Sequence, residues 1–378
     1  MKNACQPTPN LNTRLPVCLL LALVLLAACS PAPAPSPTPQ PAPGIEFAWE
    51  YKAGDYIRSI PLVHENVLYL GSDDNSLHAL DPITGDLQWV YETGDNLTST
   101  PAVLDDSLYF TSWDGNLYAL DIKSGKTLRT FPTGGWISAS PLVDGERVYI
   151  ASHDGSIYAL DLQTGELTWS FETAGRIESS PALLDGLLYT ASADGNVYAL
   201  DAETGDLVWS FPTSGPLLAS PIAAEGLVYA PSTDRRLYAL DGETGELLWS
   251  FQSGRLFEGT PALGGELIYI GGDDGSLYAL DRLAGGLLWE APLEGMVRST
   301  PLVYAGLVFV GDDGGTLSAL DPGTGQVVWS YRTGGAITAG PVVYGDMLYV
   351  GSLDRRLHAF RITQPGPLPV EGEPQDEG

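Results

Sequence analysis

The chain has 378 residues, of which 47 are Asp or Glu and 18 are Lys or Arg, so its formal net charge is −29. This acidity excludes nucleic acid as a partner, because phosphate backbones require a basic surface. A hydrophobic content of 44% excludes a wholly disordered chain and is sufficient for a large core. All three cysteines lie within the first 29 residues, so the remainder has neither a disulfide nor a cysteine-based metal site.

Residues 1–28 predict a signal peptide. An apolar run from Leu15 to Ala28 is too short to span a bilayer but suits the core of a signal sequence. It ends in Leu26-Ala27-Ala28-Cys29, which resembles the lipobox of bacterial lipoproteins. The resemblance implies that Cys29 carries lipid and anchors the mature chain outside the cytoplasm. The membrane would be the outer membrane, on its periplasmic side, if the host has one, and otherwise the outer face of the cell membrane. The alternative is an ordinary secretory signal in which Cys29 is incidental.

Two proline-rich segments flank the body of the chain. Residues 29–44 carry Pro at nearly every second position after Cys29, which predicts an extended spacer of roughly 45 Å. Residues 363–378 are rich in Pro and acidic side chains and are expected to be disordered. The folded part is therefore expected to cover residues 45–362.

Residues 45–362 contain one unit repeated eight times. A proline recurs every 40 residues without insertion or deletion, at Pro61, Pro101, Pro141, Pro181, Pro221, Pro261, Pro301 and Pro341. Each unit contains four short β runs, as in ISASPLV, ERVYIAS, SIYALD and ELTWSFET of residues 137–173. Four-stranded units with this period predict an all-β protein, an eight-bladed β-propeller.

The turns between the predicted strands explain much of the acidity. Asp154-Gly155 between the second and third runs predicts a tight hairpin whose two central residues have positive φ. Between the third and fourth runs lies Asp-x-x-Thr-Gly, as in residues 161–165, where the aspartate accepts bonds from the turn's own amides. We favour this structural role for the aspartates over calcium binding.

Residues close to the repeated proline predict the inner part of each blade. The two positions before it are nearly all small, as needed where eight strands surround a central channel. The position four before it is always apolar, as Ile57 and Phe257 illustrate, and should pack between blades.

A tryptophan recurs on the fourth strand and predicts how the ring closes. Blade 2 has Arg129 at this position. Because Trp49 continues the series only if the count wraps around, residues 45–53 should supply the outer strand of the blade that contains residues 336–362. We interpret the tryptophans as structural anchors that dock blades together: Trp49, Trp89, Trp169, Trp209, Trp249, Trp289 and Trp329.

The repeat resembles a known family. The segment Ala79-Leu-Asp-Pro-Ile-Thr-Gly-Asp-Leu-Gln-Trp89, with copies at 159–169, 199–209, 239–249 and 319–329, is similar to the tryptophan-docking repeat of PQQ-like quinoprotein propellers. The copy in blade 2 departs from the pattern at Ser124 and Arg129, and the copy in blade 6 departs at Ala284. The resemblance implies the propeller architecture but does not imply that PQQ binds.

Two classes within this superfamily differ in function. Quinoprotein dehydrogenases are longer and carry insertions, calcium ligands, a catalytic Asp and often adjacent cysteines, whereas this chain has no Cys-Cys pair and no insertion. The BamB-like lipoproteins are lipid-anchored, eight-bladed scaffolds of the outer-membrane β-barrel assembly machinery. The resemblance favours a monomeric, BamB-like scaffold that binds protein partners and uses no cofactor. A PQQ-dependent dehydrogenase and a ligand-sensing propeller remain the alternatives.

A search for chemistry in the sequence assigns no catalytic, cofactor-binding or metal-binding residue. His78 and His358 occupy matching positions in blades 1 and 8, where most other blades have Tyr. A metal-binding pair is the alternative to a half-buried substitute for Tyr, which we favour. No G-x-S-x-G motif occurs, and the glycine-rich stretches precede no helix.

Positions that break the repeat are candidates for partner contact. Asp234-Arg235-Arg236 and Asp354-Arg355-Arg356 replace the Asp-Gly turn in blades 5 and 8. The hairpins and the loops before each first strand should share one face of the disc, where arginines and aromatic residues are typical of protein contacts. The candidates are Arg235, Arg236, Arg355, Arg356, Arg58, Arg298, Trp136, Arg176 and Arg255. The alternatives are a solvated charge pattern and a ligand site at the channel mouth.

Overall fold

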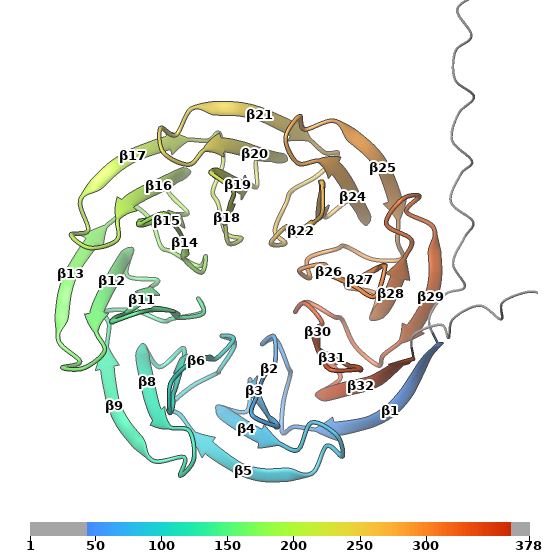
Figure 1. The fold of residues 1–378 in the computed structure, drawn as a ribbon, viewed down its shortest axis with the longest axis horizontal. Coiled ribbons are helices and arrows are strands. Elements are labelled where there is room, and N and C mark those ends of the chain that lie inside the picture. Colours follow the sequence, from blue (N-terminus) through green and yellow to red (C-terminus); the bar gives the residue numbers. More distant parts are fainter. Residues whose placement is uncertain (1–43, 364–378) are drawn as a thin grey trace, which may run out of the picture. The chain divides into compact units, whose positions relative to one another are not determined.

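The computed structural model describes residues 44–363, which form a ring of eight four-stranded antiparallel sheets around a central axis (Figure 1). This confirms the eight-bladed β-propeller predicted from the 40-residue period. The signal peptide 1–28, the anchor Cys29, most of the spacer 29–44 and the tail after residue 363 lie outside the described residues. Within residues 44–363, no helix has the length and hydropathy needed to cross a membrane.

The inner half of each blade consists of the first and second strands. The first strands are β2 (Leu62–His64), β6 (Ala102–Leu104), β10 (Leu142–Asp144), β14 (Ala182–Leu184), β18 (Ile222–Ala224), β22 (Ala262–Gly264), β26 (Leu302–Tyr304) and β30 (Val342–Tyr344). The second strands are β3 (Val67–Ser72), β7 (Ser107–Thr111), β11 (Arg147–Ala151), β15 (Leu187–Ala191), β19 (Leu227–Pro231), β23 (Leu267–Gly271), β27 (Leu307–Gly311) and β31 (Met347–Gly351).

The outer half consists of the third and fourth strands. The third strands are β4 (Ser76–Leu80), β8 (Asn116–Asp121), β12 (Ser156–Asp161), β16 (Asn196–Asp201), β20 (Arg236–Asp241), β24 (Ser276–Asp281), β28 (Thr316–Leu320) and β32 (Arg356–Thr363). The fourth strands are β5 (Leu87–Glu92), β9 (Thr127–Pro132), β13 (Leu167–Glu172), β17 (Leu207–Pro212), β21 (Leu247–Gln252), β25 (Leu287–Pro292), β29 (Val327–Arg332) and β1 (Gly44–Lys52).

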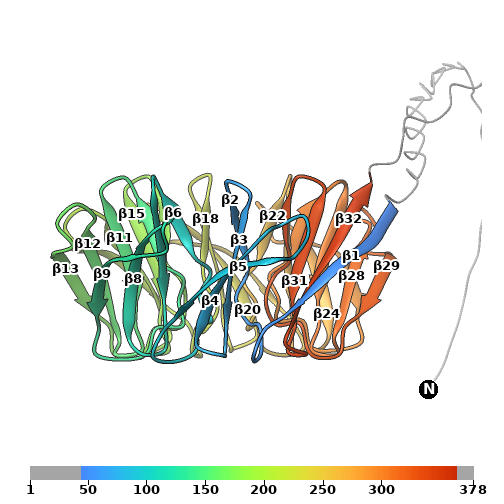
Figure 2. The ribbon, with the colours of Figure 1, turned by 90° about the horizontal axis from the view of Figure 1, so that it is seen from below.

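The first and last strands of the described chain close the ring. β1 pairs with β32 in the sheet β1-β32-β31-β30, from Gly44 opposite Thr363 to Lys52 opposite Arg356. Both ends of the described chain therefore meet at one edge of the disc (Figure 2). Phe47 of β1 stacks on Tyr331 of β29 in the neighbouring blade, with ring centroids 6.0 Å apart. The predicted closure is confirmed, and β1 and β32 each extend one residue beyond the predicted 45–362.

The first strands are shorter than the sequence suggests, since β10 begins at Leu142 and the run from Ile137 to Pro141 is not strand. The reason is that proline has no backbone N–H to donate. In blade 1 the side chain of Ser59 supplies hydrogen bonds to the second strand in place of backbone bonds. Its Oγ donates to the Gly71 carbonyl (2.8 Å) and accepts from the Gly71 amide (3.0 Å). The apolar position four before the proline is buried in every blade, including Ile57 and Phe257.

The Asp-Gly hairpins also differ from the prediction. Only Gly155 has positive φ (90°), and the turn is closed by its N–H donating to the Ser152 carbonyl (3.1 Å). Asp154 contributes its side chain instead, accepting the Ser156 amide at Oδ1 (2.8 Å). Hairpins with positive φ at both central residues lie between the first and second strands, as at Asp185 (52°) and Gly186 (80°).

The Asp-x-x-Thr-Gly turns have the expected geometry. Asp81 Oδ1 accepts the amides of Ile83 (2.8 Å) and Thr84 (2.9 Å), and Gly85 has φ of 77°. Hydrogen bonds from these two amides, that of Thr84 first, hold the pKa of Asp81 below its usual value. This aspartate is therefore used by the backbone of its own turn.

The fourth-strand tryptophans lie over the turn glycines of the next blade. A Cβ built at Gly205 would come within 2.6 Å of the Trp169 ring, so only glycine fits beneath the indole. Trp169 Nε1 donates to the Ala202 carbonyl (3.2 Å), which also accepts from the Tyr149 hydroxyl (3.0 Å). The tryptophans that face a glycine this closely are Trp49, Trp169, Trp209, Trp249 and Trp289. Trp89 also faces a glycine, but its ring would lie 3.8 Å from a Cβ built at Gly125. In blade 7, Trp329 packs edge-on against Phe360 instead (5.4 Å between centroids).

Candidate partner-binding face

The second-to-third-strand hairpins and the loops that precede the first strands form one surface, which we call the hairpin face. In blade 1, the Asp73 amide of the hairpin donates to the Tyr56 carbonyl of the loop (2.9 Å). The Gly54 amide of the same loop donates to Asp74 Oδ2 (2.7 Å). Because hairpin and loop are bonded together, side chains on both are presented from a fixed backbone.

The hairpin aspartates fix the third strand as well. In blade 2, Asp114 Oδ2 accepts from the Tyr118 hydroxyl (2.6 Å) and from the Gly94 amide (2.8 Å). His78 occupies the tyrosine position in blade 1, with Nε2 3.1 Å from Asp74. Burial alone would raise the pKa of Asp74, but the hydrogen bond with His78 and those from the Gly54 amide and the Ser72 hydroxyl lower it overall.

His358 makes the same contact in blade 8, with Nε2 3.0 Å from Asp354 Oδ2. Both histidines therefore stand where most blades have the tyrosine that bonds the hairpin aspartate. Across residues 44–363, no group of three or more His, Cys, Asp and Glu side chains is arranged to hold a metal ion.

The four arginines that replace the Asp-Gly turns lie at two kinds of position. Arg235 (φ 76°) and Arg355 (φ 70°) stand at the tips of their hairpins, where most blades have glycine. Arg355 Nε lies 3.6 Å from Asp55, and its guanidinium carbon lies 5.9 Å from the centre of the Tyr56 ring. Positive φ is unfavourable for an arginine, so these two tips are held in place by their hairpins.

The other two arginines of this set reach the outer strand of their blade. Arg236 Nη1 donates to the Ser250 hydroxyl (3.1 Å), and Arg356 Nε lies 3.1 Å from Glu50. Both are only partly exposed. The tips Arg235 and Arg355 are thus more open to a partner on the hairpin face than Arg236 and Arg356.

Arg298 is the centre of an ion-pair cluster between blades 6 and 7. Its guanidinium binds Asp273 with two hydrogen bonds (3.0 and 2.9 Å) and lies 3.0 Å from Glu258 and 3.5 Å from Asp313. The hydrogen bonds to Asp273 raise the pKa of Arg298. Burial raises the pKa values of Glu258 and Asp313, and the charge of Arg298 opposes this only in part.

The remaining candidate arginines are exposed and differ in their partners. Arg58 Nε donates to Asp73 (2.8 Å), and Arg176 pairs with Glu178. Arg255 lies on the loop before the first strand of blade 6 and is exposed.

An aromatic stack lies on the hairpin face at blades 2 and 3. Trp136 is 55% exposed and lies parallel to Trp113, with centroids 5.4 Å apart and an interplanar angle of 5°. His153 flanks it at 5.9 Å, and burial lowers the pKa of that imidazole. Sequence reasoning selected Trp136 but missed Trp113, which the hairpin position just before Asp114 could have revealed.

Hydroxyl groups connect neighbouring blades around the channel. Ser140 Oγ accepts the Thr100 amide (2.9 Å), and Ser180 Oγ accepts the Ser140 amide (2.8 Å). Ser220 Oγ continues the series by accepting the Ser180 amide (2.9 Å). The small residues before the prolines thus form hydrogen bonds between neighbouring blades.

Comparison with solved structures places the fold among known propellers. BamB from Moraxella catarrhalis aligns with a TM-score of 0.73 and 22% identity, over 84% of this chain and 100% of that one. The computationally designed Ika8 protein aligns with a TM-score of 0.76, at 18% identity and the same coverages. A europium-containing methanol dehydrogenase aligns with a TM-score of 0.72 and 16% identity, over 84% of this chain and 93% of that one. At these identities the likeness shows the fold alone.

Sequence comparison gives two results. No curated protein matches the chain. A family model described as outer membrane protein assembly factor BamB matches residues 46–130, 95–183, 174–258 and 252–365, which together span the whole propeller. On this match, the chain belongs to the BamB family of PQQ-like β-propellers.

Proposed function

We propose that this protein is a scaffold that binds protein partners without catalysis and contributes to the assembly of outer-membrane β-barrels. The observation that carries the proposal is the family match across residues 46–365. In this proposal, lipid on Cys29 holds the propeller outside the cytoplasm, at the periplasmic side of an outer membrane, and no PQQ is bound.

The hairpin face supports a role in partner binding. Its backbone is fixed by hydrogen bonds between hairpins and loops, so little order would be lost on binding. It presents the exposed Trp136 and the exposed guanidinium of Arg235, and Trp and Arg are the residue types enriched at the centres of protein interfaces.

The position of β1 supports a particular orientation. Lys52 pairs with Arg356 beside the hairpin face, and Gly44 pairs with Thr363 at the other end of the strand (Figure 2). Nine residues of strand span about 30 Å. The chain therefore enters the propeller at the end of β1 that lies away from the hairpin face.

Photo-crosslinking in native membranes tests the proposal. A photoreactive residue at Arg235 should capture a component of the barrel-assembly machinery, identified by mass spectrometry. The matched control is the same photoreactive residue at Leu283, which is 59% exposed in the turn between β24 and β25 and should capture no such component. Equal capture at both positions, or no assembly component at Arg235, would reject the assignment.

A second experiment tests the arginines directly. Changing Arg235, Arg236, Arg355 and Arg356 together to Ser should weaken recovery of the partner in a pull-down, with the two hairpin tips contributing most. An unchanged pull-down would remove these residues from the contact surface.

The alternative function, a PQQ-dependent dehydrogenase, is tested by adding PQQ and calcium to the protein together with a redox dye. Reduction of the dye would favour that function over scaffolding.

A further inference from the structure

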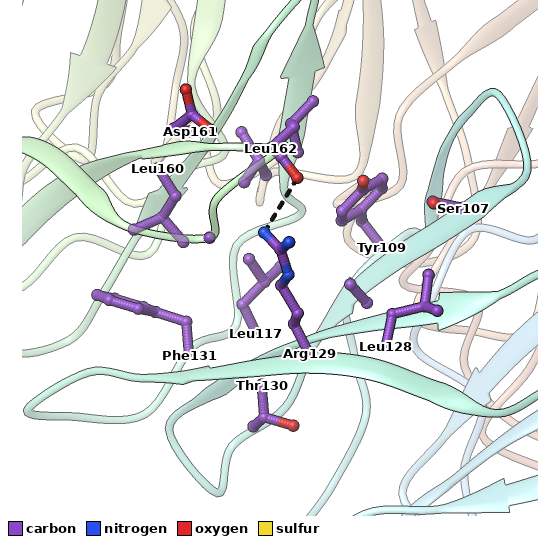
Figure 3. A pocket seen from close by; sticks show the side chains of 13 residues that line it. Ser107, Tyr109, Leu117, Leu128, Arg129, Thr130, Phe131, Leu160, Asp161 and Leu162 are labelled. Carbon is purple, nitrogen blue, oxygen red and sulfur yellow. Dashed lines mark hydrogen bonds between the residues drawn. The ribbon is translucent and has the colours of Figure 1, made fainter.

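The junction between blades 2 and 3 contains a cavity of about 500 Å³, which is lined in part by β9, the outermost strand of blade 2 (Figure 3). It lies where Arg129 replaces the repeated tryptophan. Its walls include Tyr109, Leu117, Val148 and Leu160, all of which are at most 8% exposed. A cavity of this size is within the range of small-ligand sites.

The walls of the cavity correspond to those that surround an indole in the next junction. In blade 3, Trp169 packs in a buried cluster whose members lie 40 residues after the cavity residues. The corresponding pairs are Tyr109 and Tyr149, Leu117 and Ile157, Ala119 and Ala159, Val148 and Leu188, Leu160 and Leu200, and Leu162 and Ala202. The cavity is thus built from the residues that elsewhere in the ring enclose a flat bicyclic ring.

Arg129 replaces the hydrogen bond of the indole but not its volume. Trp169 Nε1 donates to the Ala202 carbonyl (3.2 Å), and Arg129 Nη1 donates to the corresponding Leu162 carbonyl at the same distance (Figure 3). Arg129 Nη2 also donates to the Gln163 carbonyl. Arg129 also lies over Gly165, as the tryptophans lie over their glycines. The polar requirement of the turn is therefore satisfied by a side chain that is smaller than an indole.

Burial at the two junctions agrees with this difference. Tyr109 and Ala119 are each 8% exposed, whereas the corresponding Tyr149 and Ala159 are 2% and 0% exposed. Leu128 stands at the rim of the cavity and is 52% exposed. The lining is mixed, since Ser107, Arg129 and Asp161 add polar groups beside the apolar walls. A ligand that is flat and apolar but carries one polar atom would suit such a lining.

We propose that this cavity binds a planar, indole-sized aromatic group. The ring would contact the apolar walls and lie against the guanidinium of Arg129, whose plane stacks well on aromatic faces. The aromatic group could belong to a free small molecule or to a side chain of a polypeptide. Since the cavity lies on the rim and not on the hairpin face, this inference does not depend on the scaffold function.

Binding is tested with 5-fluoroindole followed by fluorine NMR, a signal that the tryptophans of the chain do not obscure. The wild-type protein should broaden the signal saturably. Arg129→Trp should weaken binding at least tenfold, because the indole fills the cavity as in the other junctions. Arg332→Trp makes the same exchange at a 65% exposed rim position and should bind like the wild type. No binding to the wild type, or equal binding to Arg129→Trp, would overturn the proposal.

A second variant keeps the test valid if Arg129→Trp does not fold. Ala119→Leu adds bulk to the cavity wall and should also weaken binding of 5-fluoroindole, and unchanged binding would count against the site.

Two competition experiments show whether the aromatic group belongs to a small molecule or to a polypeptide. A short peptide with one Trp should compete with the probe, and its Trp→Ala version should not, if the site accepts side chains. Displacement only by free indole would assign the site to small molecules.

Discussion

Two sectors of the hairpin face have the same backbone and opposite chemistry. Trp113 at blade 2 and Asp273 at blade 6 both donate their amides to the carbonyl of the preceding loop, at 2.9 and 3.0 Å. The side chain of Trp113 stacks on the exposed indole of Trp136, whereas the side chain of Asp273 binds the guanidinium of Arg298. The repeat therefore fixes the backbone of each hairpin while leaving one side chain free to vary.

The two sectors should respond differently to substitution and to pH. The cluster of Arg298 joins one cation to three carboxylates, so its stability depends on charge balance. The stack of Trp113 and Trp136 depends on ring contact and contains no ion pair. Its surface is also the more open of the two, since Trp136 is 55% exposed while the Arg298 side chain is 35% exposed.

The largest effect is expected for Arg298→Ala. Loss of the cation leaves the carboxylates of Asp273, Glu258 and Asp313 close together without a counter-charge. We expect a loss of about 2 kcal/mol in the free energy of unfolding, less than for a fully buried pair because Arg298 is partly solvated. Urea unfolding at pH 7 measures this loss.

The control for that experiment is Arg332→Ala. Arg332 pairs with Glu294, and both side chains are 65% exposed, so the expected loss is no more than about 0.5 kcal/mol. Equal losses in the two variants would mean that the Arg298 cluster behaves as an ordinary surface ion pair.

A smaller effect on stability is expected for Trp136→Ala. The variant loses the parallel contact with Trp113, which is worth about 1 kcal/mol for an aromatic pair. If the stack belongs to the partner surface, the variant should lose more free energy of binding than free energy of unfolding. We expect the Kd for the partner to rise about thirtyfold, which corresponds to about 2 kcal/mol. Thermal unfolding and partner titration on the same sample separate the two effects, and a loss of stability alone would remove the stack from the contact surface.

The smallest effect concerns pH. Burial raises the pKa of Asp313, so between its unfolded and folded pKa values the native state holds more protons than the unfolded state. Stability in that window therefore falls as the pH rises. Asp313→Asn removes the carboxyl whose ionisation lowers stability. The free energy of unfolding of this variant, relative to that of the wild type, should therefore rise by a few tenths of a kcal/mol from pH 4 to pH 7. Urea midpoints at both pH values test this, and a constant difference would contradict the direction.

The repeat made most of the fold predictable. The 40-residue step determined the number of blades, and the displaced Trp49 identified the closing strand, because both follow from a period that no insertion interrupts. The hairpin details were less predictable, since Asp154 forms its turn with its side chain and not with positive φ. Local sequence does not distinguish these two ways of closing a short turn.

The candidate site was predictable only in part. The sequence placed Arg298 on the hairpin face but did not reveal its three carboxylates, because Glu258 and Asp273 come from two separate segments of blade 6 and Asp313 comes from blade 7. Arg129 was visible as a break in the tryptophan series, yet its consequence was not. Whether an arginine fills the space between two blades or leaves a cavity there depends on the conformation of its side chain, which cannot be read from the sequence.

The pairing of β1 with β32 has a consequence for how the protein forms on the ribosome. Gly44 and its partner Thr363 are separated by 319 residues, so β1 is synthesised long before its partner exists. Bringing such distant segments together costs about 5 kcal/mol of chain entropy, on the (3/2)RT ln n scale. β1 must therefore wait without its partner strand until the last blade has been synthesised.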